Sequence, residues 1–257
     1  MVAFDLETSG FSFRLDDILE IAMVAEDGRS FQISVLTDKP IPKHITKITG
    51  ITPKENKHNG VSQACAWYRM NSWLLSLGSD ITLVGHNILM FDLPFLFHLG
   101  NKLGVVNVFQ FVDAIDTLTI CRDKRVKQRL KQMGCKRLKL GDLHRWCIGE
   151  PISSAHRAIY DARANLAVFR SSKFQALFPD GISHTPRDQC YSSYTDRFQR
   201  LSKQVPDNGK GVSKYWYYTL LSDTPSSKTW CNFHPLQSAY VRDCGNKEPN
   251  KSVVSKA

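Results

Sequence analysis

The chain has 257 residues, of which 42% are hydrophobic, and a formal net charge of +10. This composition suffices for a buried core, while no apolar run approaches the ~20 residues that a membrane-spanning helix requires. Integral membrane proteins are therefore excluded, and Asp5 and Glu7 near the start exclude a secretory signal peptide, which carries an apolar core there.

Three strands are expected first. Residues 2–8, 17–26 and 30–37 are short apolar runs typical of strands, and Asp27-Gly28 indicates a hairpin turn between the second and third. Proline and glycine interrupt the next segment, 39–52, which predicts a loop.

Helices and strands then alternate. The hydrophobic spacing predicts helices over 62–78, 91–104, 117–122, 140–149 and 153–178, with strands over 81–87 and 105–114. Asp116 and Thr117 are expected to cap the helix that follows them. Three consecutive strands followed by alternation predict an α/β fold, a mixed five-stranded sheet flanked by helices.

The character of the sequence changes after Phe178, where polar residues dominate. We expect residues 1–178 to form the main domain, 179–245 a partly ordered appendage and 246–257 a disordered tail. Seven cysteines without a CxxC pair predict reduced thiols in an intracellular protein, of nucleus or cytoplasm. Cys231, His234 and Cys244 offer three of the four ligands of a structural zinc site.

Two acids stand on the first strand. Asp5 and Glu7 share one face of it, because side chains alternate along a strand. Two carboxylates in an apolar setting are costly unless a positive charge lies between them, which points to a metal ion.

Two further segments add acids. Asp92 falls where the strand over 81–87 gives way to its helix, and His156 precedes Asp161 by five residues. Five helical steps turn the chain by ~500°, so these two cannot share a helix face. If both serve one site, His156 must lie on the loop or first turn and Asp161 inside the helix, with Ser153 or Ser154 as N-cap.

Together these segments resemble a known family. "FDLETSG", "HN…FD" and H-x4-D resemble the three motifs of the DEDDh, or DnaQ-like, 3'→5' exonucleases of the ribonuclease H-like superfamily. "ITGIT" (48–52), "DTL" (116–118) and "KLGDL" (139–143) resemble the family's accessory segments in the expected order. The resemblance covers residues 2 to about 170 and implies a ribonuclease H-like fold and a DEDDh exonuclease domain over 1–178. The chain also shows a more distant resemblance to the exonuclease-like domain of promyelocytic leukaemia proteins.

The resemblance also implies a mechanism. Asp5, Glu7 and Asp161 would hold the first of two Mg²⁺ or Mn²⁺ ions, Asp5 would bridge to the second, and Asp92 would act through water. His156 would take the proton from the attacking water, a task suited to histidine. Two such ions can clamp the attacking and leaving oxygens of a phosphodiester, and they prefer carboxylate ligands.

Substrate contacts are expected in two places. The backbone over Leu6–Thr8 and the side chains of Asn87 and Phe91 would position the terminal nucleotide, from a single-stranded 3' end. The segment 122–139 holds nine Lys or Arg against one acid, a local net charge of +8, which indicates a polyanion partner. Its anchoring residues would be Lys124, Arg125, Lys127 and Arg129, although most such charge runs are simply solvated faces.

Other interpretations stay open. Taken singly, Asp92 is explained as a helix N-cap, His156 as a surface residue and Asp161 as a solvated helix position. A non-catalytic nucleic-acid-binding or scaffold protein with an exonuclease-derived fold is the alternative, and a trimmer of very short RNA is a third. The presence of all five expected residues favours the enzyme. The sequence leaves open DNA or RNA, single or double strand, and a homodimer.

Overall fold

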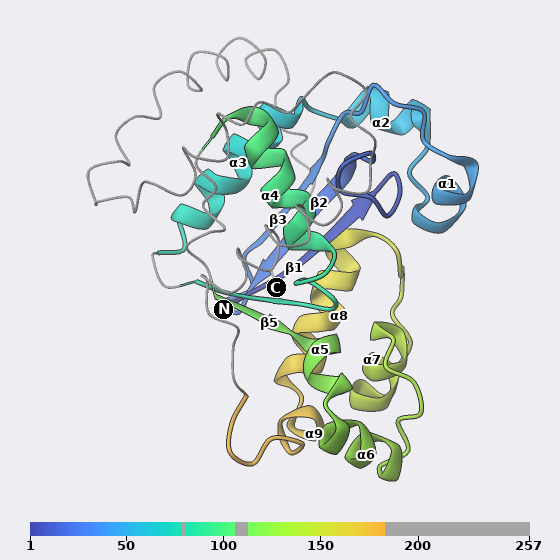
Figure 1. Cartoon of the computed structure of the whole chain (residues 1–257), viewed down its shortest axis with the longest axis vertical. Helices are drawn as coiled ribbons and strands as arrows, with labels where there is room; N and C mark the ends of the chain where they lie inside the picture. The colour runs from blue at the N-terminus through green and yellow to red at the C-terminus, as the bar shows by residue number, and fades with distance from the viewer. Residues whose placement is uncertain (79–80, 106–112, 183–257) are drawn as a thin grey trace, which may run out of the picture. The chain divides into compact units, whose positions relative to one another are not determined.

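A computed structural model describes residues 1–78, 81–105 and 113–182 (Figure 1). These residues belong to one compact unit. The proposed zinc ligands, the tail and nearly all of the expected appendage lie outside the described residues, as does most of the strand expected over 105–114.

The sheet has five strands in the order β3-β2-β1-β4-β5. β1 pairs antiparallel with β2, and β2 with β3, whereas β4 runs parallel to both β1 and β5. This confirms the predicted mixed sheet. The strands are β1 (Val2–Thr8), β2 (Ile18–Ala25), β3 (Ser30–Ser34), β4 (Thr82–Gly85) and β5 (Asp113–Asp116).

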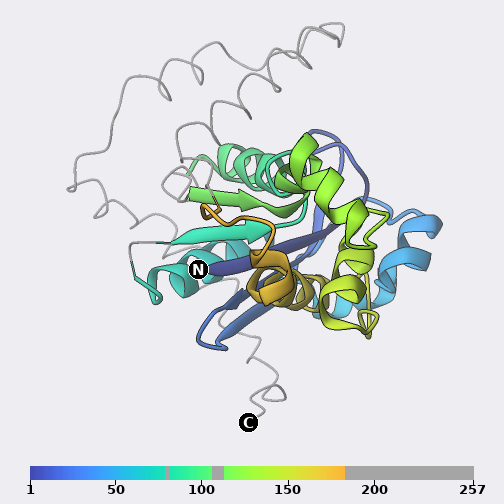
Figure 2. The same cartoon turned by 90° about the horizontal axis from the view of Figure 1, so that it is seen from below.

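Helices cover both faces of the sheet (Figure 2). Ala3 packs in a buried cluster with Ile159 and Ala162 of α8, so the face of β1 that carries Asp5 is the one that α8 covers. On β3 the ring of Phe31 packs against Trp73 of α3, on the opposite face. The helices are α1 (Lys43–Thr49), α2 (Pro53–Asn59), α3 (Gln63–Leu75), α4 (Asp92–Leu103), α5 (Thr117–Arg122), α6 (Lys124–Gln132), α7 (Leu140–Ile148), α8 (Ala158–Arg170) and α9 (Ser172–Gln175).

The loop predicted over 39–52 is wrong, because it contains α1. Gly50 ends this helix at φ +74°, and the Thr52 hydroxyl caps α2 by accepting the backbone N–H of Glu55 at 3.0 Å. Proline and glycine here mark helix ends rather than an unstructured stretch.

The single helix predicted over 153–178 is also wrong. α8 begins only at Ala158, and Ser171 interrupts the helical run by capping α9, its hydroxyl accepting the N–H of Phe174 at 3.1 Å. Neither Ser153 nor Ser154 is the N-cap of α8; that position belongs to Arg157, without a side-chain cap of its own.

Cys121, Cys135 and Cys147 are free, as expected, whereas Cys65 is disulfide-bonded, which departs from the expectation of reduced thiols throughout. Within the described ranges, no helix combines the length and apolar character that a membrane crossing needs.

Candidate active site

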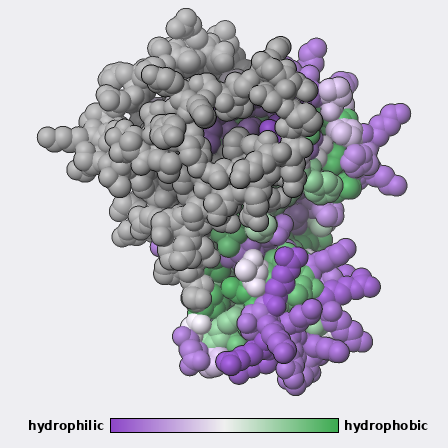
Figure 3. Space-filling model, in the orientation of Figure 1, coloured by the Kyte–Doolittle hydropathy of each residue, from purple (hydrophilic) through white to green (hydrophobic). Residues whose placement is uncertain are grey.

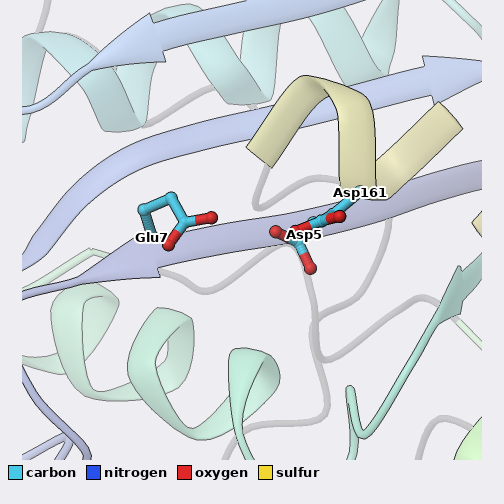
Figure 4. Close-up of side chains that lie close together, drawn as sticks. All are labelled: Asp5, Glu7 and Asp161. Atoms are coloured by element: carbon cyan, nitrogen blue, oxygen red, sulfur yellow. The ribbon is translucent and has the colours of Figure 1, made fainter. Parts of the chain in front are cut away.

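The acids gather where the parallel strands β1, β4 and β5 end, the edge at which open α/β sheets bind ligands. Asp5 and Glu7 project from β1 toward the first turn of α8, which supplies Asp161 (Figure 4). One carboxylate oxygen from each of these three residues lies within 4.8 Å of the others. The structure therefore brings together residues that are more than 150 positions apart.

Asp92 approaches from another element. It is the first residue of α4, is only 3% exposed, and its Oδ1 accepts the backbone N–H of Leu6 at 3.1 Å. The N-cap of α4 is Phe91, so the interpretation of Asp92 as a helix cap is wrong. Asp92 lies outside the three-carboxylate group, but its charge raises the pKa of Asp5.

All four carboxyl groups are difficult to ionise. Burial, and then the charges of Asp92, Glu7 and Asp161, raise the pKa of Asp5 well above its ordinary value. Burial raises the pKa of Glu7 to about 8, with Asp161 the next contributor, and burial also raises the pKa of Asp92 to about 8. The pKa of Asp161 is raised by burial as well.

This donor set fits a hard divalent cation. Carboxylates held at such pKa values become fully charged near neutral pH only if positive charge enters the cluster. The three-residue group contains oxygen donors and neither thiolate nor imidazole, which suits Mg²⁺ or Mn²⁺ better than zinc.

His156 lies on the loop that precedes α8, in the left-handed backbone region at φ +68°. Its backbone N–H donates to Oδ2 of Asp161 at 2.9 Å, which holds the exposed histidine beside the acidic group. The loop position agrees with the geometric prediction, but Asp161 lies in the first turn of α8 rather than deeper in the helix.

Glu20 on β2 is a residue that sequence reasoning missed. It lies opposite Glu7, is 1% exposed, and accepts the Arg157 Nη2 at 2.8 Å and the backbone N–H of Ala158 at 3.0 Å. Glu20 thus fixes the positions of the two residues that follow His156, through these hydrogen bonds. The available signal was a glutamate within the apolar run "ILEIAMVA", because a buried acid requires a partner.

Asp116 organises the other side of the site. Besides capping α5 as predicted, its carboxylate accepts the backbone N–H of Asn87 at 2.9 Å and of Leu89 at 3.2 Å. These bonds fix the loop between β4 and α4, including Asn87 at φ +74°, and so fix the entry of Asp92.

One of the predicted backbone contacts, at Leu6, is already engaged within the protein, and so is the side chain of Thr8. The N–H of Leu6 is bound by Asp92, and the Thr8 hydroxyl donates to the carbonyl of Gly10 at 2.6 Å. Asn87 and Phe91 lie on the loop and helix start beside Asp92.

An aromatic surface adjoins this loop. The ring of Phe91 lies 5.2 Å from that of Phe95 and 6.3 Å from that of Phe11 between centroids. Phe11 is 77% exposed and Met90 46% exposed. Sequence reasoning missed Phe11, whose position directly after the "ETSG" turn was the available signal.

The four predicted basic anchors lie on α6, outside the acidic group. Lys124, Arg125 and Lys127 are exposed. Arg129 is exposed as well, but its Nη1 donates to the carbonyl of Leu177 at 2.9 Å and so serves the fold.

Comparison with known proteins adds independent findings. A family model described as "Exonuclease" matches residues 2–169. The DNA polymerase III PolC-type of Mycoplasma genitalium is 33% identical over 175 residues, covering 65% of this chain and 11% of that protein. The Clostridium perfringens protein of the same name is 30% identical over 177 residues, which cover 66% of this chain and 11% of that protein. The chain thus spans about a tenth of the length of these curated relatives.

Solved structures share the fold. The zinc-bound complex of Escherichia coli ExoI with single-stranded DNA matches with a TM-score of 0.59 and 22% identity, covering 69% of this chain and 41% of that one. E. coli exonuclease I with a dA16 oligonucleotide matches with a TM-score of 0.55 and 19% identity, covering 77% and 42%. The ribonuclease H-like fold is thereby confirmed, whereas the resemblance to promyelocytic leukaemia proteins stays a prediction.

Proposed function

The chain belongs to the exonuclease family, and on that premise we propose that it is a metal-dependent 3'→5' exonuclease acting on phosphodiester bonds of DNA or RNA. The observation that carries this proposal is the group formed by Asp5, Glu7 and Asp161, with Asp92 beside Asp5. The PolC-type relatives and the ExoI–ssDNA complex support a nucleic-acid partner with a single-stranded 3' end.

In this proposal Asp5, Glu7 and Asp161 would hold one Mg²⁺ or Mn²⁺, and Asp5 and Asp92 would serve a second. Such ions, when bound, neutralise the charge that develops on the attacking and leaving oxygens. Two of these carboxylates are available without breaking any contact, because among the described residues neither Asp5 nor Glu7 has a hydrogen-bond or ion-pair partner for its side chain.

His156 is the proposed general base. A water molecule attacks the phosphorus, its proton passes to an imidazole nitrogen of His156, and the bond to the 3'-oxygen breaks while solvent protonates that oxygen. His156 is suited to this because it is exposed and fixed next to Asp161 through its own backbone. The hydrogen bonds of Glu20 with Arg157 and Ala158 maintain that placement.

The terminal base fits the aromatic surface of Phe11 and Phe91. Stacking on an aromatic ring is worth about 1–3 kcal/mol per base and tolerates any base. Asn87, held by Asp116, borders the same loop. These contacts position the last phosphodiester without reading its sequence.

A non-catalytic nucleic-acid-binding or scaffold role is the second candidate. It predicts binding without cleavage and gives no reason for retaining four neighbouring carboxyl groups with raised pKa values, whose mutual repulsion costs stability. The catalytic proposal explains that cost.

The test uses single-stranded DNA and RNA of about 20 nucleotides, labelled at the 5' end, with Mg²⁺, Mn²⁺ or chelator. We expect a ladder that shortens from the 3' end only with added metal. Asp161→Asn should abolish the ladder, and Asp27→Asn, an exposed acid in the β2–β3 turn, should not. Robust hydrolysis in chelator, or immediate release of a labelled mononucleotide, contradicts the proposal. A difference between the rates at which the DNA and RNA ladders shorten reveals a preference for one of them.

A further inference from the structure

One face of α6 consists entirely of basic and amide side chains. Val126 and Leu130 point toward the core, and at 100° per residue the opposite face is centred on Gln128. Lys124, Lys131 and Lys127 form one row on one side of Gln128, and Gln132 and Arg125 lie on its other side. This region appears as the dense group of hydrophilic side chains at the lower right of Figure 3.

The positive charges of this face are not neutralised by the described part of the protein. No Lys or Arg of segment 122–139 forms an ion pair there. The one acid of the segment, Asp123, is used to cap α6, its Oδ1 accepting the N–H groups of Arg125 and Val126 at 2.9 and 3.1 Å. Lys127 and Lys131 repel each other at i,i+4 spacing, and Lys124 faces the positive end of the helix dipole.

The contacts that hold α6 in place are made by its inward side and not by these charges. Leu130 is fully buried in a cluster that includes Phe174 and Leu177. Arg129 binds the Leu177 carbonyl, and the Trp146 Nε1 donates to the carbonyl of Met133 at 2.9 Å. The protein therefore fixes α6 firmly and presents a row of lysines that contributes nothing to its own packing.

The basic face follows, along the chain, the segment that holds the loop before Asp92. α5 is capped by Asp116, whose carboxylate also holds the loop that leads to Asp92, and α6 follows directly after Asp123 (Figure 1). A six-residue helix is ~9 Å long, so one short helix joins the two. A strand whose 3' end lies at the acidic group therefore reaches α6 only with the nucleotides that lie beyond its last three.

We propose that Lys124, Arg125, Lys127 and Lys131 form a second binding surface for the phosphodiester backbone of the strand whose 3' end is cleaved. The assignment of that end rests on the proposed function, whereas the binding does not. A lipid surface fits poorly, because the outward face of α6 carries no exposed apolar side chain and only Met133, 45% exposed, follows at the end of the helix. This set differs from the one expected from the sequence. It includes Lys131 and leaves out Arg129, whose side chain is hydrogen-bonded to the Leu177 carbonyl.

The experiment compares two triple variants of the full chain. Lys124→Gln/Lys127→Gln/Lys131→Gln removes the row, and glutamine preserves helix propensity. Arg29→Gln/Lys102→Gln/Arg170→Gln removes the same charge from exposed positions in the β2–β3 turn, in α4 and at the end of α8. Affinity for a fluorescent single strand of about 30 nucleotides is measured in chelator, so that no cleavage occurs, across about 50–200 mM salt.

We expect the α6 variant to bind at least tenfold more weakly at low salt, with the log–log salt slope reduced by about 2, since each lost contact on a single strand removes ~0.7. The control variant should match wild type. Equal affinity and parallel slopes for the α6 variant would overturn the proposal. Binding to phosphatidylserine vesicles is measured in parallel, and a loss of vesicle binding without a loss of single-strand binding would also overturn it.

A second arm separates this proposal from the proposed function. Metal-dependent cleavage of a trinucleotide, which is too short to reach α6, should be the same in the α6 variant and in wild type. If neither protein cleaves any substrate while the α6 variant still loses affinity, the exonuclease proposal fails and the binding surface stands. Impaired trinucleotide cleavage overturns the separate surface, since the lysines would then act at the catalytic group.

Discussion

Replacing Glu7 by glutamine should stabilise the metal-free protein at alkaline pH. Burial, followed by the charges of Asp161, Glu20 and Asp92, raises the pKa of Glu7 from its ordinary value of 4.5 to about 8. The folded state therefore holds a proton on Glu7 that the unfolded state has released. Glutamine has the same shape as the protonated acid and carries no charge at any pH.

The sign and size of this stabilisation follow from the linkage between proton binding and folding. Because the native state binds more protons between pH 4.5 and about 8, the free energy of unfolding falls as pH rises through that window and levels off above it. At about 1.4 kcal/mol per pH unit, the whole window corresponds to about 5 kcal/mol for this one group, as an upper limit. Relaxation of the folded protein and entry of water reduce this limit. We therefore expect Glu7→Gln to be more stable than wild type by about 2–3 kcal/mol at alkaline pH.

The assay is urea unfolding in chelator at several pH values from 5 to about 9, for wild type, Glu7→Gln and a matched control, Glu150→Gln. Glu150 is exposed and lies outside the acidic group. The curves of wild type and Glu7→Gln should nearly coincide at pH 5 and diverge toward pH 9, with Glu7→Gln the more stable. Added Mg²⁺ should narrow the difference by stabilising wild type more.

Two results would refute this reasoning. If wild type and Glu7→Gln keep a constant difference at all pH values, Glu7 does not titrate between pH 4.5 and about 8 in the folded protein. If Glu7→Gln is less stable than wild type at pH 9 without metal, the carboxylate is held by favourable contacts instead of being crowded.

Four further predictions concern activity. His156→Ala should lower kcat by about 10²–10⁴-fold, the usual contribution of a general base, with the calorimetric Mg²⁺ affinity unchanged; a parallel loss of affinity would make His156 a ligand. Asp5→Asn and Asp161→Asn should each remove nearly all activity while circular dichroism stays native, and near-normal turnover in either would exclude its role. Glu20→Ala should change kcat more than KM. Glu20→Gln should recover part of the lost kcat, because the amide oxygen still accepts the Ala158 N–H. An equal loss of kcat in both variants would assign the loss to the ion pair with Arg157 alone. A protein ending at residue 182 should retain trinucleotide cleavage, and a folded but inactive product would show that the domain extends further.

Part of the site follows from local periodicity. Strand alternation places Asp5 and Glu7 on one face, and the five-residue spacing of His156 and Asp161 excludes a shared helix face. Both deductions agree with the observed geometry, because each depends only on the repeat of one element. The mixed sheet was predictable for the same reason: three adjacent strands preceded the alternation of helices and strands.

The start of α8 could not be predicted in this way. Its first N–H donates to Glu20, 138 residues earlier in the chain, so no local residue was needed as a cap and the serines at 153 and 154 were misleading. The same holds for the Leu6 N–H, which Asp92 binds across 86 residues. Long-range carboxylates here perform tasks that local propensity assigns to neighbours.

The buried acids of this fold divide into two kinds, and hydrogen bonding separates them better than burial does. Glu20 and Asp116 are as buried as Asp92, yet each accepts several N–H groups and thereby fixes a segment: the residues after His156 in one case, the loop before Asp92 in the other. In the described structure, the side chains of Asp5 and Glu7 have no such donors, and Asp161 has one. A carboxylate that accepts few hydrogen bonds keeps lone pairs for an ion, so the acids with several donors position the site and those with one donor or none are available to form it. Substituting an acid of the first kind should therefore alter geometry and stability together, whereas removing a charge of the second kind should raise metal-free stability as activity is lost.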